Sequence, residues 1–247
     1  HGRETGGPAL RVLGFAARAA LLNQIAEVLA KNRADYLQIA LQNSGSPESD
    51  ASIDIDGSIY TLKYYAKLGA ALGDARHFQD GDVTSLSKDG AFGAVHLMLA
   101  VDGVAVLINA FNFPAWGLWE KAAPALLSGV PVLAKPATST AWLTYRMVRD
   151  VIAAGVLPEG ALSLVCGSAR DLPAQLTFND VLAFTGSADT ARGLRSHPLV
   201  LERGVRVNVE ADSLNAALLG PDVGADSEEF KLYVREVVRE MTIKAGQ

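Results

Sequence analysis

The sequence contains one cysteine and four histidines among its 247 residues. Cys166 has no second thiol with which to form an internal disulfide, so the chain is not a disulfide-stabilised secreted module. The histidines, His1, His77, His96 and His197, are scattered and offer no metal-ligand spacing. We therefore predict no disulfide framework and no metal site, and a reducing, cytoplasmic setting fits best.

Positive charge and long apolar runs are also scarce. Lys and Arg number 22 against 27 Asp and Glu, and the two signs are well mixed, so we predict no nucleic-acid partner. Charged residues, glycines and prolines interrupt every apolar stretch well before the roughly 20 residues of a membrane helix, so we predict no membrane partner. The 49% hydrophobic content is enough for the core of one large domain or two smaller ones.

The first third of the chain has apolar residues at helical spacing. From Leu13 to Leu41 the pattern predicts a helical hairpin or a bent helix, which Gly45 and Pro47 end. A second pattern of the same kind covers Ile53 to Leu72. Residues 1–82 are therefore expected to be mainly helical.

A turn between two strands is predicted next, at Asp102-Gly103. Two short strand-like runs, His96–Val101 and Val104–Ala110, flank the dipeptide Asp102-Gly103. Asp-Gly between such runs is a strong turn signal.

From Val104 onward strand-like and helix-like segments alternate. Strands are expected at residues 104–109, 131–135, 162–166, 181–184 and 205–209. Helices are expected at residues 115–128, 139–154, 169–177 and 188–196, with a last amphipathic helix over Ser227–Ile243. Repeated βα units of this length predict an α/β fold, a Rossmann-like parallel sheet with helices on both faces.

The segments that leave the strands are the places to expect a ligand, because open parallel sheets bind ligands at the carboxyl ends of their strands. No G-x-G-x-x-G fingerprint is present. The nearest glycine turn, Phe184–Ser187, leads into a helix and can direct N–H groups and the Ser187 hydroxyl toward a phosphate. The alternative is an ordinary glycine turn in which Ser187 caps the helix.

Four side chains near strand exits have both a chemical and a structural interpretation. Asn112 suits a donor to a developing oxyanion, or an asparagine that stabilises a turn. Lys135 suits a ribose or phosphate ligand, or a solvated lysine, and Glu210 suits a general base or an exposed carboxylate. Cys166 lies within a predicted strand, which favours an inert packing residue over a nucleophile.

Taken in order, five motifs resemble the aldehyde dehydrogenase superfamily. They are Asn112-Phe113-Pro114, the helix end Ala125–Gly129, Lys135-Pro136-Ala137, Phe184–Ser187 and Glu210. Each motif is modest alone, but five in this order and spacing are highly specific. The helices before residue 75 and a hairpin around residues 85–103 also suit that superfamily, which uses such a hairpin to build dimers or tetramers. The resemblance therefore implies a homodimer or homotetramer.

The resemblance implies a mechanism with a covalent intermediate. A cysteine thiolate attacks an aldehyde, an asparagine amide holds the oxyanion, hydride passes to a nicotinamide, and a glutamate activates water to hydrolyse the thioester. Asn112 matches the asparagine and Glu210 matches the glutamate. The cofactor-binding residues implied are Ala110, Phe111, Lys135, Pro136, Ala137, Thr138, Gly167, Phe184, Thr185, Gly186 and Ser187.

The same resemblance implies a division of the chain. Residues 1–82 are expected to be the helical part of the cofactor-binding domain, 83–103 an oligomerisation hairpin, and 104–247 the dinucleotide-binding α/β core. The catalytic domain is expected outside the 247 residues. Thr242–Gln247 resembles the approach to the superfamily's reactive cysteine, so the nucleophile is expected just beyond Gln247.

Some residues depart from the common pattern. Ala110-Phe111 replaces Pro-Trp, Ala191 replaces a glycine after the phosphate-binding turn, and Glu210–Ser213 replaces Glu-Leu-Gly-Gly. These variants resemble the branch that oxidises CoA-thioester semialdehydes in aerobic breakdown of phenylacetate and benzoate. Thr138 stands where NAD-preferring relatives carry a glutamate that repels a 2′-phosphate, so NADP is the expected cofactor, with NAD possible.

Two other interpretations stay open. The chain lacks a plausible nucleophile, which favours a non-catalytic nucleotide-binding or assembly module. It also suits the dehydrogenase half of a fused ring-cleavage protein with a hydratase domain.

Overall fold

The computed structural model describes residues 1–168, 171–213 and 216–246. Its helices are α1 (Gly7–Arg11), α2 (Phe15–Lys31), α3 (Arg33–Ser44), α4 (Glu48–Ala71), α5 (Trp116–Leu127), α6 (Ala141–Ala153), α7 (Ala188–Arg195), α8 (Pro198–Glu202) and α9 (Glu228–Thr242). Its strands are β1 (Phe78–Ser85), β2 (Gly93–Met98), β3 (Ala105–Ile108), β4 (Val132–Lys135), β5 (Leu162–Leu164), β6 (Val181–Gly186) and β7 (Arg206–Ala211). Short helical turns are η1 (Gly2–Gly6), η2 (Thr138–Thr140), η3 (Leu172–Gln175) and η4 (Ile243–Gly246).

The N-terminal region is helical, as predicted. The predicted helical hairpin or bent helix is two helices, α2 and α3. Helix α2 ends at Lys31, and the side chain of its C-cap residue Asn32 donates a hydrogen bond back to the Val28 carbonyl at 2.8 Å. Helices α2 and α4 pack along each other, and Leu22, Leu29 and Leu62 are fully buried between them and the rest of the core.

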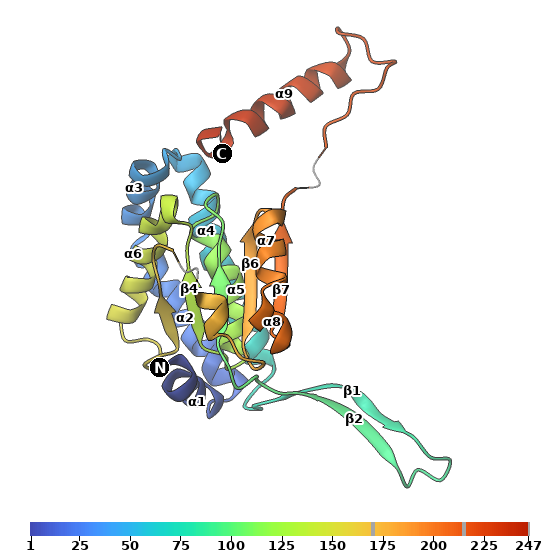
Figure 1. Ribbon diagram of the computed structural model, residues 1–247. Helices are drawn as coiled ribbons and strands as arrows, with labels where there is room; N and C mark the ends of the chain where they lie inside the picture. The colour runs from blue at the N-terminus through green and yellow to red at the C-terminus, as the bar shows by residue number, and fades with distance from the viewer. Residues whose placement is uncertain (169–170, 214–215, 247) are drawn as a thin grey trace.

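The main sheet has five parallel strands in the order β5-β4-β3-β6-β7. Successive residues of a strand point to opposite faces, so Ala105 and Leu107 of β3 join the core under α2, α4, α5 and α6. Val106 joins the second core, which includes Val200 of α8 on the other face. The predicted α/β fold with helices on both faces is confirmed (Figure 1).

A two-stranded hairpin projects from this body (Figure 1). β1 and β2 pair in antiparallel fashion, and their connection runs through Ser87–Gly90, where the Asp89 carboxylate accepts from the Ser87 hydroxyl at 2.6 Å. The hairpin therefore begins at Phe78, inside the region predicted to be helical. The predicted Asp102-Gly103 turn connects β2 to β3, which lie in different sheets, so its two flanking runs do not pair.

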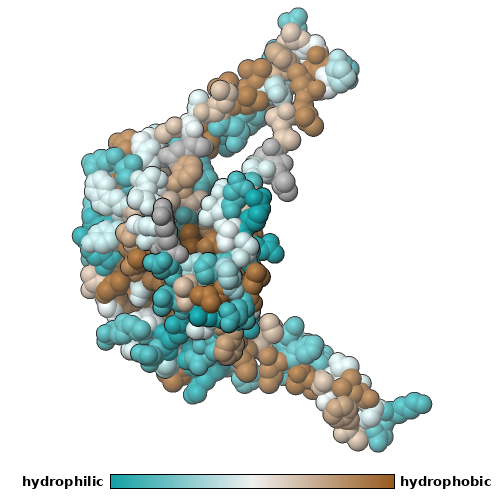
Figure 2. All heavy atoms as spheres, in the orientation of Figure 1, coloured by the Kyte–Doolittle hydropathy of each residue, from teal (hydrophilic) through white to brown (hydrophobic). Residues whose placement is uncertain are grey.

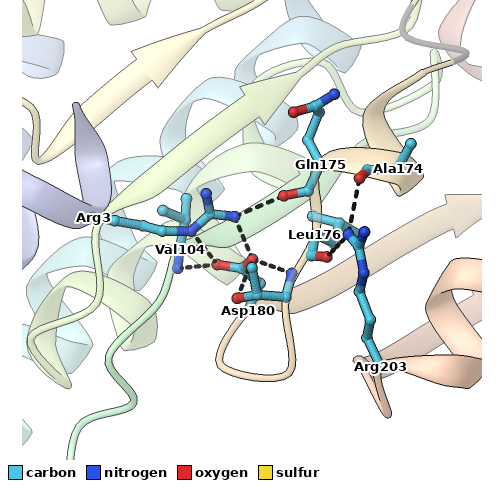
Figure 3. Close-up of polar contacts among 8 residues, drawn as sticks. Arg3, Val104, Ala174, Gln175, Leu176, Asp180 and Arg203 are labelled. Atoms are coloured by element: carbon cyan, nitrogen blue, oxygen red, sulfur yellow. Dashed lines mark hydrogen bonds and ion pairs between the residues drawn. The ribbon is translucent and has the colours of Figure 1, made fainter.

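The amino ends of β3 and β6 are joined to the N-terminus by the buried carboxylate of Asp180 (Figure 3). Its oxygens accept from the Arg3 guanidinium at 2.5 and 3.1 Å, from the Val104 N–H at 2.8 Å and from the Thr177 N–H at 2.7 Å. Burial alone would raise the pKa of Asp180, but these hydrogen bonds, led by Arg3, hold it below its ordinary value. The carboxylate thus links the N-terminal turn to the amino ends of two strands, at the end of the sheet opposite the carboxyl ends of those strands.

Two sequence predictions around β5 need correction. β5 pairs with β4 for only three residues, Leu162–Leu164, so Cys166 lies beyond the strand and is exposed, not packed in the core. The helix predicted at residues 169–177 is the short turn η3, and its first two positions lie outside the described residues.

The last segment departs from the body. Residues 216–226 contain no helix or strand, and α9 extends away before the chain returns near α3 and α4 (Figure 1). Within the described ranges, no single helix is long and apolar enough to cross a membrane. Gly2–Arg11 and Phe15–Lys31 pass that test only as a pair bent by 114°.

Candidate functional site

A cleft of about 820 Å³ opens at the carboxyl ends of β3, β4, β6 and β7. The chain adds β4 and β5 on one side of β3 and then β6 and β7 on the other, so strand order reverses at β3. Ligands of parallel α/β sheets bind at such a reversal. The volume lies within the roughly 300–1,000 Å³ of small-molecule sites.

Most of the residues singled out from the sequence line this cleft. They are Ala110, Phe111, Asn112, Lys135, Ala137, Thr138, Phe184, Thr185, Gly186, Ser187 and Glu210. Pro136 and Gly167 do not belong to the described lining: Pro136 is buried, and Gly167 follows the edge strand β5 with a φ of 89°. The structure therefore brings Asn112 and Glu210 into one cleft.

The Asn112 segment connects β3 to α5 and is held from two sides. On the α6 side, the Thr140 hydroxyl donates to the Phe111 carbonyl at 3.0 Å and the Thr144 hydroxyl to the Pro114 carbonyl at 2.6 Å. From α4, the Asp54 carboxylate accepts from the N–H groups of Ala115 and Trp116. Asn112 thus lies on a loop that is held by hydrogen bonds at the carboxyl end of β3.

Lys135 is the last residue of β4 and supplies the positive charge among the residues that line the cleft. Its carbonyl accepts from the Asn109 N–H at 3.1 Å, which aligns the ends of β3 and β4. Thr138 begins the turn η2 three residues later and is exposed. A cation and a hydroxyl therefore stand on the same wall.

The opposite wall is the turn from β6 into α7. Ser187 caps α7, because its hydroxyl oxygen accepts from the Thr190 N–H at 3.3 Å, so the structural interpretation of this serine holds. The Asp212 carboxylate accepts from the Ala188 N–H at 3.0 Å. Part of the helix N-terminus is thus already satisfied within the protein, and the Ser187 O–H, which donates to the Thr190 hydroxyl oxygen at 3.0 Å, remains exposed to the cleft.

Glu210 lies near the end of β7, and its side chain is 66% exposed. Its carboxylate accepts from the Thr185 hydroxyl at 3.1 Å, and the Lys121 ammonium lies 3.5 Å from the same oxygen. Lys121 also pairs with Glu120, which lines the cleft. Glu210 is therefore a solvated carboxylate held loosely by one hydroxyl and one cation.

Several residues that line the cleft were not among the predicted site residues, although Phe113 lies in a predicted motif and Asp212 in the segment Glu210–Ser213. They are Ile108, Asn109, Phe113, Trp116, Gly117, Glu120, Thr190 and Asp212. Those on the first turns of α5 and α7 follow the predicted segments by less than one turn, so extending each strand exit into its helix would have found them. Asn109 is a different case: it is 4% exposed, and neither polar atom of its side chain has a hydrogen-bond partner among the described residues.

Asp54 carried no signal in the sequence, since it is one acidic residue in a helical pattern. Burial raises its pKa to about 6, although the N–H groups of Trp116 and Ala115 lower it. Only the tertiary structure shows that it caps another helix.

A sequence model of the aldehyde dehydrogenase family matches residues 4–247. Over 245 residues the chain is 58% identical to 3,4-dehydroadipyl-CoA semialdehyde dehydrogenase of Aromatoleum evansii. That match covers 99% of this chain and 48% of the relative, so the chain spans about half the length of the curated relatives that it matches.

Solved structures share the fold. The crystal structure of PnpE in complex with nicotinamide adenine dinucleotide has a TM-score of 0.80 at 23% identity, over 97% of this chain and 46% of that one. The structure of 3,6-anhydro-L-galactose dehydrogenase in complex with NAP has a TM-score of 0.81 at 18% identity, over 98% and 48%.

Proposed function

The chain belongs to the aldehyde dehydrogenase family, and from that premise we propose that it is the cofactor-binding part of an enzyme that oxidises an aldehyde to an acid with NAD(P). The observation that carries the proposal is the cleft itself. Asn112 and Glu210 share it with Lys135 and with the turn from β6 into α7. An amide donor, a carboxylate and a phosphate-compatible wall are three of the parts that this chemistry requires beside the thiol nucleophile.

The residues of the cleft fit a dinucleotide. The Lys135 ammonium and Thr138 hydroxyl suit a ribose or its phosphate on one wall. The exposed Ser187 hydroxyl at the start of α7 suits the pyrophosphate on the other, once its proton turns from the Thr190 hydroxyl oxygen to the ligand. Asp212 takes the Ala188 N–H group and Ser187 takes the Thr190 N–H group, which leaves the Asp189 N–H group of the first turn to the ligand. When bound, the nicotinamide supplies the hydride acceptor.

Asn112 and Glu210 have separate roles in this proposal. The Asn112 amide donates to the oxyanion that forms when a thiolate adds to the aldehyde, and again when water adds to the thioester. Glu210 accepts a proton from the attacking water. Its exposure and its single hydroxyl donor leave one carboxylate oxygen available for that proton.

The thiol nucleophile of the proposed reaction is not Cys166. That residue follows β5 at the sheet edge and does not belong to the described lining of the cleft. We assign the nucleophile to a cysteine outside these 247 residues. Iodoacetamide labelling should therefore inactivate the enzyme in step with another cysteine, and inactivation in step with Cys166 would contradict the assignment.

NADP is the proposed preferred cofactor. Thr138 is exposed on the wall of the cleft near Lys135. A hydroxyl and a lysine ammonium can both donate hydrogen bonds to a 2′-phosphate, and neither repels its negative charge. The proposal keeps NAD as a weaker alternative.

The proposed substrate is a CoA-thioester semialdehyde from the breakdown of an aromatic compound. The support is the 58% identity to 3,4-dehydroadipyl-CoA semialdehyde dehydrogenase, whose name specifies a CoA-linked semialdehyde, together with the residue variants that resemble the aromatic-breakdown branch. The proposed division of the chain has a helical part and an α/β core that bind the cofactor, and a hairpin that joins subunits into a dimer or tetramer. The hairpin carries exposed apolar side chains, including Phe92 and Leu97 (Figure 2).

An exposed free thiol at Cys166 supports a cytoplasmic setting.

The proposal is tested by transient kinetics on the polypeptide that carries this chain. Glu210→Gln should leave a burst of reduced cofactor but block steady turnover, since oxidation precedes hydrolysis. Asn112→Ala should slow both phases about a hundredfold or more. Glu202→Gln, at the end of α8 and outside the cleft lining, is the matched control and should change neither. Normal turnover in both cleft variants, or failure of the wild type to bind either dinucleotide, would overturn the proposal.

A further inference from the structure

A buried carboxylate on α4 caps a helix that is distant in the sequence. Asp54 is 5% exposed, and its two oxygens accept from the Ala115 N–H at 3.1 Å and from the Trp116 N–H at 2.7 Å. These N–H groups begin α5, three residues after Asn112. The positive end of the α5 dipole therefore faces the carboxylate directly.

The contact between α4 and the start of α5 is close over more than this cap. The Trp116 indole N–H donates to the Thr61 hydroxyl at 3.0 Å. A Cβ placed on Gly57 would come within 2.6 Å of the Trp116 ring, so glycine is required for this approach. The Asn112 side of the junction is equally near, because Asp54, Asn112 and Pro114 line one small cavity between α4 and the loop.

We propose that Asp54 is a positioning residue for Asn112: its carboxylate fixes the first turn of α5 and, through Phe113 and Pro114, the orientation of the Asn112 amide in the cleft. The proposal extends the function proposed above, in which that amide donates to an oxyanion. A donor used in this way must be held in place before reaction, since reorganisation during the reaction costs rate.

Protonation of Asp54 gives the proposal a measurable consequence. A protonated carboxyl keeps one good acceptor and loses its charge, so it holds two N–H groups less firmly than the carboxylate does. The charged groups that act on Asp54 are the Lys244 ammonium of η4, which favours the carboxylate, and the Glu120 carboxylate of α5, which opposes it. Asp50 of α4 lines the same cavity and accepts from the Lys244 N–H at 2.6 Å. The loop should therefore loosen as the pH falls through about 6, to which burial raises the pKa of Asp54.

The test follows the side-chain amide signals of Asn112 in ¹⁵N-labelled protein between pH 5 and 8. They are assigned by their loss in Asn112→Ala. In the wild type they should shift with a midpoint near pH 6, and in Asp54→Asn, which cannot ionise, the shift should disappear. Asp56→Asn removes a carboxylate from the same helix, one that pairs with Arg33 and not with α5, and should leave the shift unchanged.

A second readout addresses the cap itself. In Asp54→Ala, hydrogen exchange at the Ala115 and Trp116 N–H groups should be about fivefold faster or more, the scale of a lost cap. If the Asn112 signals do not titrate in the wild type, or titrate equally in Asp54→Asn, the proposal is wrong. If they titrate as expected while Asn112→Ala turns over normally, Asp54 still positions Asn112, and the oxyanion role of the proposed function is what fails.

Discussion

Two buried aspartates show how the surroundings of one carboxyl group decide its charge. Asp180 accepts from a guanidinium and two N–H groups, and its pKa falls below the ordinary value. Asp54 accepts from two N–H groups and forms no ion pair with the nearby Lys244 ammonium, which only partly offsets burial, and its pKa rises to about 6. Both carboxyl groups are hydrogen-bonded, but Asp180 accepts more hydrogen bonds, and the one from Arg3 lowers its pKa most.

The raised pKa of Asp54 predicts how stability depends on pH. A group whose pKa is higher in the folded chain stabilises the fold fully below its ordinary pKa, and this contribution is lost as the pH rises through the folded value. Above about pH 6 the buried charge therefore costs stability. Asp54→Asn should be more stable than the wild type at pH 8, by up to about 3 kcal/mol, and the gap should shrink below pH 6. Urea unfolding at several pH values measures it, and a gap that widens toward acid would contradict the prediction.

The side-chain amide of the native Asn109 is predicted to lower the free energy of unfolding. Its side chain is buried, and both polar atoms lack hydrogen-bond partners among the described residues. Asn109→Val removes an unsatisfied amide and should raise the free energy of unfolding by about 1 kcal/mol. Asn208→Val, at an exposed position of β7, is the control and should change it by less than about 0.5 kcal/mol. A clear loss of stability in Asn109→Val would show that the amide is satisfied in solution.

Thr138 allows a direct test of cofactor preference. Thr138→Glu places a carboxylate on the wall beside Lys135, where it accepts from a ribose hydroxyl and repels a 2′-phosphate. The ratio of the NADP to the NAD dissociation constant, measured by calorimetry, should rise at least about tenfold. Ser139→Glu, the next residue of η2, is the control, since it does not belong to the described lining of the cleft. An unchanged ratio, or tighter binding of NAD by the wild type, would count against the proposed preference.

Among the elements of secondary structure, the two ends of the sheet are fixed in different ways. At the amino end, Asp180 joins η1, β3 and β6 through buried hydrogen bonds (Figure 3). At the carboxyl end, loops and helix N-termini surround an open cleft. The amino end of the sheet is thus held together by buried hydrogen bonds, and the carboxyl end contains the candidate site.

Removal of the Asp180 charge should destabilise the whole sheet. Asp180→Asn weakens an ion pair whose carboxylate is buried, and the expected loss is about 3 kcal/mol at neutral pH. Since the pKa of Asp180 is lowered in the fold, this contribution is present above its ordinary pKa and is lost as the pH falls through the folded value. Asp102→Asn breaks an ion pair with Arg11 whose carboxylate is 72% exposed, and should cost less than about 1 kcal/mol. Equal losses in the two variants would refute this account of the amino end.

At the scale of the whole molecule, the body carries two projections with exposed apolar side chains, the hairpin and α9 (Figure 2). An isolated two-stranded hairpin is marginal in water. Phe92 is 64% exposed and Leu97 48%, which favours a hairpin that is covered in an assembly of subunits.

Replacement of these side chains should therefore weaken association and leave the body folded. Phe92→Ser with Leu97→Ser should shift sedimentation equilibrium toward the monomer at a protein concentration where the wild type is associated. Tyr60→Ser with Tyr64→Ser, two exposed tyrosines of α4, should not. If the mass is the same for the hairpin variant and the wild type, the hairpin does not join the subunits.

The sequence by itself determined the elements, the parallel sheet and most of the cleft. Periodicity and turn residues act over a few positions, so they locate strands, and strand exits such as Asn112 and Lys135 then share one edge of a parallel sheet. The resemblance to the family supplied the proposed role of the residues at each strand exit. Local signals failed where pairing decided the outcome: the hairpin turn lies at Ser87–Gly90, and β5 ends before Cys166.

Only the tertiary structure decided which side chains support the site. Asp54 meets the start of α5 across 61 residues of chain, and Asp180 meets Arg3 across 177. Contacts of that separation leave no periodic trace in a sequence, because they depend on how helices pack on the sheet. For the same reason the sequence did not show that Asp54 is a buried helix cap with a raised pKa. Nor did it show that Asp180 links the amino end of the sheet to the N-terminus with a lowered pKa.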